Sequence, residues 1–288
     1  MENNKIGLVG TGSMGTAIGK LLIRSGYTLI VWNRTESKTA HLEAAGARVA
    51  KNVAELIRNS ETVIICVADY DVSNNIMEPV LNMSHLKNKT IIQLSTGTPK
   101  DAAEHAAKYD SAGANYLDGA IMSTPSQMGS SEAVILIAGD EGVFQYQKEM
   151  LNVVAPNTLY QGTKESLAAA WDLALLSYFF SALIGATHAA RIAAVEGIDI
   201  IELGKTLQAW SPVVGSIVKE SVDVIPTGKF GQSESTVNTC YISSELILRH
   251  ARQSGISTTY PGFAFQVFAN AMERGLGSED GVAIFKTM

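Results

Sequence analysis

Gly10-Thr-Gly-Ser-Met-Gly15 is the stretch that decides the fold, because it follows the apolar run Ile6–Val9 and opens a helical pattern. Three glycines at this spacing allow a tight turn, a close approach of the backbone to a pyrophosphate, and close packing of helix on strand. The helix N-terminus offers free N–H groups to phosphates. The alternative is a glycine-rich turn without a ligand. The context favours a dinucleotide site made of Gly10, Thr11, Gly12, Ser13, Met14 and Gly15.

Outward from this motif, strand-like and helical runs alternate, which predicts a mostly parallel, doubly wound α/β sheet. We expect strands at Ile6–Val9, Thr28–Trp32, Thr62–Val67, Thr90–Leu94, Asn115–Asp118 and Ala133–Ala138, and helices at Met14–Ser25, Glu36–Ala45, Val53–Arg58, Lys100–Ala112 and Glu141–Val153. After about Gly162 only helices are expected, at Leu167–Glu196, Asp199–Ala209, Pro212–Val222, Ser235–Ser254 and Pro261–Gly275. The predicted organisation is a dinucleotide-binding domain over residues 1–162, an inter-domain helix over 163–196 and an all-α domain over 197–288.

Composition narrows the class of protein. The 288 residues carry a net charge of -6 without a basic run, which argues against nucleic acid and anionic membranes as partners. The first residues, Met1–Lys5, show no secretory signal, so we expect a cytoplasmic protein. The apolar stretch Leu167–Ala190 is long enough to span a bilayer, but it contains Asp172, which is costly in lipid. We expect a buried central helix instead.

The end of the second expected strand selects the cofactor. A carboxylate is usual there in NAD enzymes, whereas this chain has neutral Asn33, cationic Arg34, the hydroxyl of Thr35 and nearby Lys38. These groups attract a 2′-phosphate and predict NADPH. The alternative is that Arg34 is an ordinary surface charge.

Two further strand ends face the same crevice of the sheet. Val67, Ala68 and Asp69 follow the third strand, and Ser95–Pro99 follow the fourth. Thr96 is predicted to reach the nicotinamide, the ribose or the substrate. The alternative is that Ser95–Thr98 cap the next helix.

Several landmarks give the chain a resemblance to a known family. They are Gly10–Gly15, Val31-Trp-Asn-Arg-Thr35, Ser95-Thr-Gly-Thr-Pro99, Tyr116-Leu-Asp-Gly-Ala-Ile-Met122 and Trp171-Asp-Leu-Ala-Leu-Leu176. On these the chain resembles the imine reductases and reductive aminases of the β-hydroxyacid dehydrogenase superfamily. The resemblance implies an N-terminal Rossmann domain and a homodimer in which the helical domains are exchanged. It also implies NADPH-dependent reduction of imines, with reductive amination as a further activity.

Two departures separate the chain from the parent hydroxyacid dehydrogenases. The Ser-Gly-Gly segment that binds a substrate carboxylate there corresponds to the apolar Ile121-Met-Ser-Thr-Pro125. The catalytic lysine has no counterpart, since the first turns of the helix carry only Asp172 and Lys164 precedes them by two turns. A carboxylate suits a cationic iminium, and a dry setting should raise its pKa. A buried Asp172 bonded to a structural donor is the alternative for this residue.

The resemblance also implies substrate-pocket residues. With Leu176 and Phe179, which lie one and two helical turns after Asp172, the expected pocket consists of Thr96, Met122, Pro125, Leu176, Phe179, Phe180, Trp210 and Asn238. Core packing is the alternative for Trp210. Many relatives have a tyrosine where this chain has Phe180, which cannot donate a proton. His188 is expected to be a hydrogen-bonded core histidine, and no metal site is expected. Two alternative functions stay open, a hydroxyacid or semialdehyde dehydrogenase and an NADPH-binding module without turnover.

Overall fold

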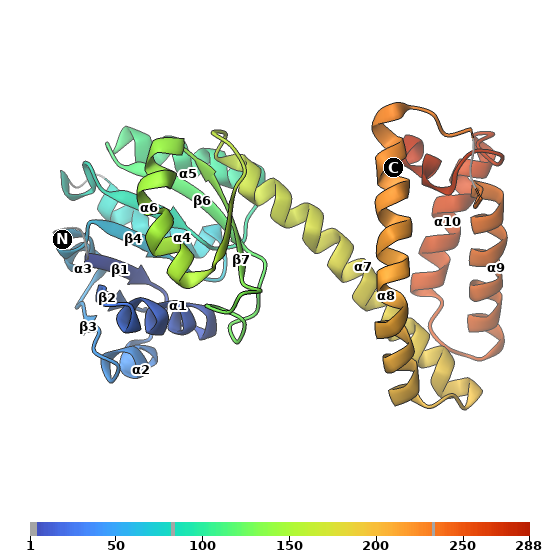
Figure 1. Cartoon of the computed structure of the whole chain (residues 1–288), viewed down its shortest axis with the longest axis horizontal. Coiled ribbons are helices and arrows are strands. Elements are labelled where there is room, and N and C mark those ends of the chain that lie inside the picture. Colours follow the sequence, from blue (N-terminus) through green and yellow to red (C-terminus); the bar gives the residue numbers. More distant parts are fainter. Residues whose placement is uncertain (1–4, 82–83, 232–233) are drawn as a thin grey trace. The chain divides into compact units, whose positions relative to one another are not determined.

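The computed structural model describes residues 5–81, 84–231 and 234–288 (Figure 1). The prediction that no secretory signal is present depends on residues 1–4, which lie outside the described residues. The chain divides into two compact units, Met1–Ser177 and Tyr178–Met288. Each unit has an apolar core of its own.

One eight-stranded sheet forms the centre of the first unit. In spatial order its strands are β3 (Arg48–Val49), β2 (Thr28–Trp32), β1 (Lys5–Val9), β4 (Thr62–Ile65), β5 (Thr90–Gln93), β6 (Asn115–Ile121), β7 (Val134–Gly139) and β8 (Asn157–Tyr160). Only the β6–β7 pair is antiparallel among the described neighbours. The predicted α/β class and the mostly parallel sheet are confirmed.

Helices follow the strands of this unit. They are α1 (Ser13–Arg24), the 3-10 turn η1 (Glu36–Thr39), α2 (Ala40–Glu43), α3 (Val53–Asn59), α4 (Tyr70–Leu81), η2 (Ser84–Leu86), α5 (Pro99–Ser111) and α6 (Glu141–Val154). The sequence did not predict α4, which begins with a polar run and contains Pro79. Strands β3 and β8 were also not predicted, because β3 has two residues and β8 buries only one side chain fully.

Two apolar cores lie on opposite faces of the sheet. Ile64 of β4 points to the core that α1 and α6 cover, with Leu22 and Leu151 among its residues. Its neighbour Ile65 points to the core that α3, α4 and α5 cover, where Met77 is buried. Alternation of side chains along buried parallel strands produces this division. It makes the sheet doubly wound.

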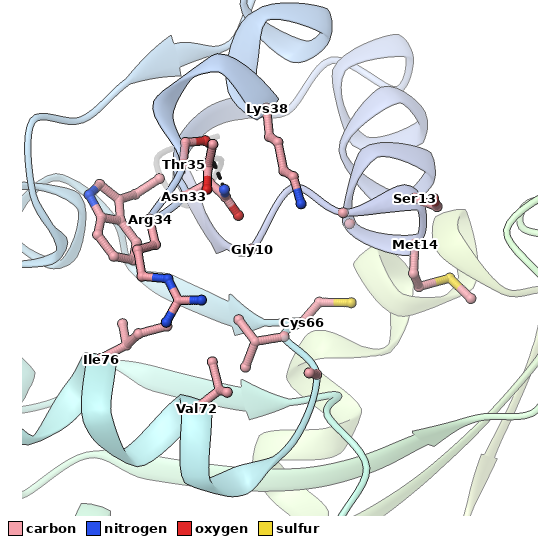
Figure 2. A pocket seen from close by; sticks show the side chains of 15 residues that line it. Gly10, Ser13, Met14, Asn33, Arg34, Thr35, Lys38, Cys66, Val72 and Ile76 are labelled. Carbon is pink, nitrogen blue, oxygen red and sulfur yellow. Dashed lines mark hydrogen bonds between the residues drawn. The ribbon is translucent and has the colours of Figure 1, made fainter.

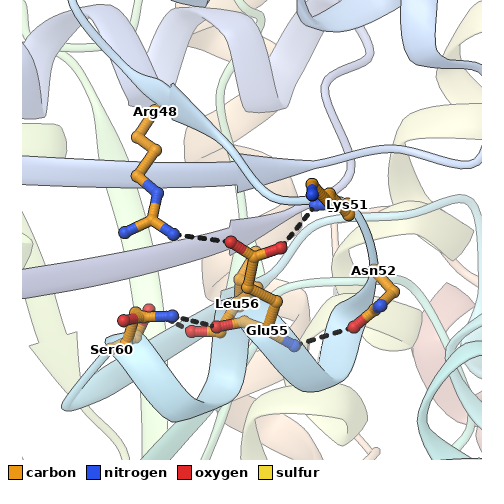
Figure 3. A network of polar contacts seen from close by, with 7 residues as sticks. Arg48, Lys51, Asn52, Glu55, Leu56 and Ser60 are labelled. Carbon is orange, nitrogen blue, oxygen red and sulfur yellow. Dashed lines mark hydrogen bonds and ion pairs between the residues drawn. The ribbon is translucent and has the colours of Figure 1, made fainter.

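A polar network holds the short strand β3 beside the start of α3 (Figure 3). The Arg48 guanidinium donates to the Glu55 carboxylate at 2.5 Å, and the Lys51 N–H donates to the other oxygen at 3.0 Å. Asn52 caps α3 by accepting the Glu55 N–H at 2.9 Å. The Lys51 N–H and then Arg48 lower the pKa of Glu55.

The second unit is helical. It contains most of α7 (Ser166–Glu196), then α8 (Ile200–Val224), the 3-10 turn η3 (Ile225–Thr227), α9 (Val237–Gln253), α10 (Thr259–Glu273) and the 3-10 turn η4 (Gly281–Thr287). The prediction of separate helices at Asp199–Ala209 and Pro212–Val222 is wrong, because α8 continues through Pro212. Proline removes a single N–H, and the Ser211 hydroxyl donates to the nearby Leu207 carbonyl at 2.7 Å.

Helix α7 is long and apolar enough to cross a membrane by length and composition alone. Only 17% of its most apolar window is buried, so the expectation of a buried helix is wrong for the single chain. The buried residues of its first two turns are Ser166, Ala168, Ala169 and Asp172, which belong to the first unit. Exposed aromatic and aliphatic side chains occur along the helix from Trp171 onward.

Candidate active site

The glycine loop between β1 and α1 has the geometry of a phosphate-binding turn. Gly10 has a φ of +97°, and a Cβ on it would lie 2.2 Å from the Cys66 carbonyl oxygen. A Cβ on Gly15 would lie 2.1 Å from the Gly10 carbonyl oxygen. Next to Gly12, no described heavy atom lies within 4 Å of the position of a Cβ. Packing therefore requires Gly10 and Gly15, while Gly12 leaves open space where a pyrophosphate fits.

A cavity of about 390 Å³ opens at this loop (Figure 2). Its lining includes most of the predicted cofactor residues: Gly10, Gly12, Ser13, Met14, Gly15, Asn33, Arg34, Thr35, Lys38, Val67 and Ala68. Figure 2 shows the side chains of Arg34 and Lys38 directed into it. In the described part of the chain neither makes an ion pair. Two cations without a protein anion fit a dinucleotide that carries an extra phosphate.

Three of the predicted cofactor residues, Thr11, Asp69 and Thr96, are not part of the cavity lining, and the first two have structural contacts. Thr11 is buried, and its hydroxyl donates to the Lys38 carbonyl at 3.0 Å. The Asp69 carboxylate accepts the Val72 N–H at 2.8 Å, at the start of α4. A direct contact of either residue with the cofactor stays a prediction.

Four lining residues were missed by the sequence analysis, namely Trp32, Cys66, Val72 and Ile76. Val72 and Ile76 are one helical turn apart on α4, which the sequence did not predict. Burial raises the pKa of the Cys66 thiol to about 12. It therefore stays neutral beside the glycine loop.

The loop after β5 both caps a helix and presents a free side chain. The Thr98 hydroxyl accepts the Asp101 N–H at 3.2 Å and caps α5, as the capping alternative predicts. Ser95 is buried, and its hydroxyl accepts the Val67 N–H at 3.1 Å. Thr96 is exposed and pairs with Asp69 in a parallel bridge. Thr96 is thus the member of this loop available to a ligand.

Asp172 lies in the second turn of α7 and is only 6% exposed. Its neighbours along the chain, Trp171 and Leu173, are 49% and 40% exposed, so the carboxylate is on the face packed in the first unit. Burial raises the pKa of Asp172, as the sequence predicts. In the described part of the chain it makes no ion pair.

A second buried carboxylate, Asp118 in β6, is close enough to Asp172 for the charge of Asp172 to act on it. It is 1% exposed and accepts hydrogen bonds from the hydroxyls of Tyr70 and, at 3.0 Å, Tyr116. The Ala169 N–H of α7 also donates to it. Burial raises the pKa of Asp118 to about 7 against these three donors, and the charge of Asp172 adds to the rise. The sequence signal was available, because Asp118 is the only charged residue of its strand.

The predicted substrate-pocket residues are divided between the two units. Thr96, Met122, Pro125 and Leu176 belong to the first, and Phe179, Phe180, Trp210 and Asn238 belong to the second. Met122 is partly buried, and its N–H donates to the Val134 carbonyl at 3.0 Å. Phe180 and Trp210 are 52% and 56% exposed. Their assignment to a substrate pocket stays a prediction.

His188 differs from its prediction. It is buried with its ring 5.6 Å from that of Tyr260, but its Nε2 has no hydrogen-bond partner among the described residues. The expectation of a hydrogen-bonded core histidine is therefore wrong for this nitrogen. No group of three or more metal-binding side chains occurs among the residues that the structure describes.

The doubly wound sheet, the glycine loop and the cationic cavity define a dinucleotide-binding protein. Residues 5–162 match the family model for the NAD binding domain of 6-phosphogluconate dehydrogenase. Residues 164–288 match the one for the C-terminal domain of NADPH-dependent reductive aminase-like proteins. A relative from Aspergillus oryzae, an NADPH-dependent reductive aminase, is 30% identical over 98% of this chain and 96% of its own length.

Solved structures agree with the family models. An imine reductase from Myxococcus stipitatus in complex with NADP+ is 27% identical, with a TM-score of 0.93 over 98% of this chain and 99% of that one. A reductive aminase from Aspergillus terreus is also 27% identical, with a TM-score of 0.92 over 99% of each chain. The chain belongs to the family of imine reductases and NADPH-dependent reductive aminases. This confirms the resemblance and agrees with the predicted NADPH-dependent oxidoreductase that acts on C=N bonds.

Proposed function

We propose that the protein catalyses the NADPH-dependent reduction of imines to amines, with Asp172 as its catalytic carboxylate. The observation that carries this proposal is the burial of Asp172, without an ion pair in the described part of the chain. From Ser166 to Ala190 the helix contains neither lysine nor arginine. A buried anionic group of this kind suits a cationic substrate.

The cavity at the glycine loop fits NADPH. Gly12 gives the pyrophosphate access to the backbone, and the N-terminus of α1 offers it N–H groups. Arg34 and Lys38 provide positive charge for the 2′-phosphate, with the Thr35 hydroxyl beside them. When bound, NADPH supplies a hydride.

The chemistry of the C=N group explains why a carboxylate is suited to this reaction. An imine accepts hydride readily only after protonation, and its iminium form is a cation. With its pKa raised by burial, Asp172 can hold a proton at higher pH than an exposed aspartate and pass it to the imine nitrogen. The carboxylate that remains then stabilises the iminium by its opposite charge. Phe180 cannot act as an acid, and we assign this role to Asp172.

The runner-up is a hydroxyacid or semialdehyde dehydrogenase, whose carbonyl chemistry needs a cationic donor beside the substrate. Lys164 precedes α7 and is exposed. Asp172 occupies the buried face instead. An NADPH-binding module without turnover is the remaining alternative, and assays with both kinds of substrate distinguish all three.

The substrate is a small molecule, either a preformed imine or a carbonyl compound with an amine. The Aspergillus terreus reductive aminase has been solved with its cofactor, cyclohexanone and allyl amine. For this chain, reductive amination is part of the proposal. The apolar character of Ile121-Met-Ser-Thr-Pro125 favours substrates without a carboxylate.

We also propose a homodimer in the cytoplasm rather than a membrane protein. The second unit exposes large apolar side chains along α7 and α8, including Phe179, Ile184, Trp210 and Ile217 at 51–56% exposure. Apolar surface of this extent usually marks an interface. A detergent-free dimer in light scattering supports the proposal, and a monodisperse monomer or a protein that needs detergent contradicts it.

The function is tested by following NADPH oxidation with a small cyclic imine, and NADP+ reduction with a 3-hydroxy acid. Turnover of the imine alone supports the proposal, and turnover of the acid alone supports the runner-up. NADPH binding without turnover supports the inactive module. Asp172→Ala should reduce imine turnover by about 10²-fold or more, while its affinity for NADPH stays at the wild-type value.

A further inference from the structure

Asp118 is a buried acid that the proposed chemistry does not use. It lies in β6 and is 1% exposed, and its carboxylate has three hydrogen-bond donors. An unneutralised carboxylate inside a protein is costly unless its donors compensate for lost water. Where such a group is retained, its contacts indicate what it holds in place.

The contacts of Asp118 join three segments that end at the carboxyl edge of the sheet. Tyr116 belongs to the same strand, and Tyr70 begins α4 directly after Asp69. The ring of Tyr70 also packs on the loop of Thr96, since a Cβ on Gly97 would lie 2.2 Å from it. Asp118 therefore fixes Tyr70, which in turn supports that loop.

The third contact reaches the catalytic helix. Ala169 lies in the first turn of α7 and is buried with Tyr70 and Ala102 in a small apolar cluster. Its N–H donates to the Asp118 carboxylate. A negative charge at a helix N-terminus is also favoured by the helix dipole. Asp172 is three residues after Ala169, so both lie on one helix face.

We propose that Asp118 is the positioning residue of Asp172, which it holds at the sheet edge by anchoring the first turn of α7. This inference rests on the proposed role of Asp172. It adds a residue in a different strand to the machinery of that site. A displacement of about 1 Å at a reacting group can cost about 10²-fold in rate.

Several titratable groups surround Asp118. Tyr70 and Tyr116 face it from α4 and β6, and Asp172 faces it from α7. His105 of α5 lies behind Tyr70 with ring centroids 4.5 Å apart, and Asp101 also acts on Tyr70. Burial lowers the pKa of His105 to about 4, so at neutral pH it brings no positive charge. Burial raises the pKa of Asp172, and the charge of Asp172 in turn adds to the rise in the pKa of Asp118.

Two substitutions at Asp118 separate position from charge. Asp118→Ala removes both the anchor and the charge, and we expect kcat for a cyclic imine to fall by about 10²-fold while the Kd for NADPH stays unchanged. Asp118→Asn keeps an acceptor oxygen of the same size. It should retain most of kcat and the limb of the pH–rate profile that reports Asp172, because burial raises the pKa of Asp172 and the substitution does not change that burial.

If Asp118→Ala does not fold, two tyrosine variants test the same proposal. Tyr116→Phe deletes a hydroxyl that donates to Asp118, whereas Tyr109→Phe deletes one from the ring stacked on Tyr116 at 5.4 Å. The first should lower kcat by about tenfold and the second should not. Hydrogen exchange of the amides at residues 166–172 should accelerate in Asp118→Ala and Tyr116→Phe only.

The outcomes are distinguishable from failure of the proposed function. If the wild-type protein reduces no imine, the proposed function is wrong, and hydrogen exchange alone then decides whether Asp118 anchors α7. If wild type is active and Asp172→Ala is not, yet Asp118→Ala keeps the wild-type kcat, Asp118 does not position Asp172. Equal exchange rates in all variants would likewise overturn the proposal.

Discussion

The backbone N–H of Thr11 donates a 3.1 Å hydrogen bond to the side-chain oxygen of Asn33. This bond ties the glycine loop to the end of β2, and the Asn33 amide nitrogen donates in turn to the Thr35 carbonyl at 2.8 Å. Asn33 thus shapes the cavity as well as lining it. Because Asn33 is uncharged, it does not offset the positive charges of Arg34 and Lys38 in the cavity.

The double role of Asn33 gives the first prediction. Asn33→Asp keeps the oxygen that accepts the Thr11 N–H but places a negative charge beside the 2′-phosphate site. We expect the KM for NADPH to rise by about tenfold or more, with little change in the KM for NADH. Asn33→Ala is the control, because it removes the bond without adding a charge and should weaken both cofactors. Equal effects of Asn33→Asp on both would contradict the predicted phosphate site.

The second prediction uses the different surroundings of Gly10 and Gly12. Gly12 has a φ of -66°, and a Cβ on it meets no described atom within 4 Å. Gly12→Ala should therefore keep the wild-type Tm, while its methyl group obstructs the pyrophosphate and raises the Kd for NADPH at least tenfold, or about 1.4 kcal/mol.

Gly10→Ala is the matched variant. Its new methyl group meets the Cys66 carbonyl oxygen at 2.2 Å, and its φ of +97° is unfavourable for alanine. We expect a clear loss of Tm without cofactor, measured by calorimetry. Wild-type NADPH affinity in Gly12→Ala would show that the pyrophosphate does not approach this residue.

The glycine loop, the cationic strand end and Asp172 could be predicted from the sequence because each depends on local pattern. The six predicted strands all occur, with ends that differ by at most three residues. Helix α4 was missed because polar residues interrupt its apolar positions and Pro79 lies within it, and Val72 and Ile76 of the cavity were missed with it. Val72 and Ile76 line the cavity because the crossover after β4 places α4 beside the glycine loop.

The sequence shows Asp118 as the one charged residue of its strand, but local pattern could not predict its role. Its three donors come from β6, α4 and α7, which are brought together only by the fold. The same limit applies to α8, where Pro212 suggested a break that the surrounding helix tolerates. The contacts of Asp118 and the continuity of α8 both depend on tertiary structure, which local sequence patterns do not contain.

The third prediction concerns the network in Figure 3. Asn52 caps α3 by accepting the Glu55 N–H at 2.9 Å. Asn52→Ala should lower the free energy of unfolding by about 1 kcal/mol. The control is Asn75→Ala, on an exposed position within α4, where alanine favours the helix and no loss is expected. Urea unfolding at one protein concentration measures both, and equal changes would contradict a capping role.

The last prediction links the buried carboxylate to the pH dependence of stability. Asp118 has a pKa of about 7 in the folded protein, against about 3.9 for an unfolded aspartate. Between these values the folded state binds more protons than the unfolded state, so this group's stabilising contribution is present at low pH and is lost as the pH rises toward 7. The loss can reach about 1.4 kcal/mol per pH unit.

Asp118→Asn does not titrate, so its free energy of unfolding relative to wild type should increase steadily from pH 4 to pH 7, as measured by urea unfolding at fixed protein concentration. Asp101→Asn provides a control of opposite sign. The Thr98 hydroxyl and N–H lower the pKa of Asp101, so wild type should lose its advantage over this variant as the pH falls. A difference between wild type and Asp118→Asn that stays constant over this range would show that Asp118 is ionised throughout. In that case the three hydrogen-bond donors, from Tyr70, Tyr116 and Ala169, would lower the pKa of Asp118 more than its burial raises it.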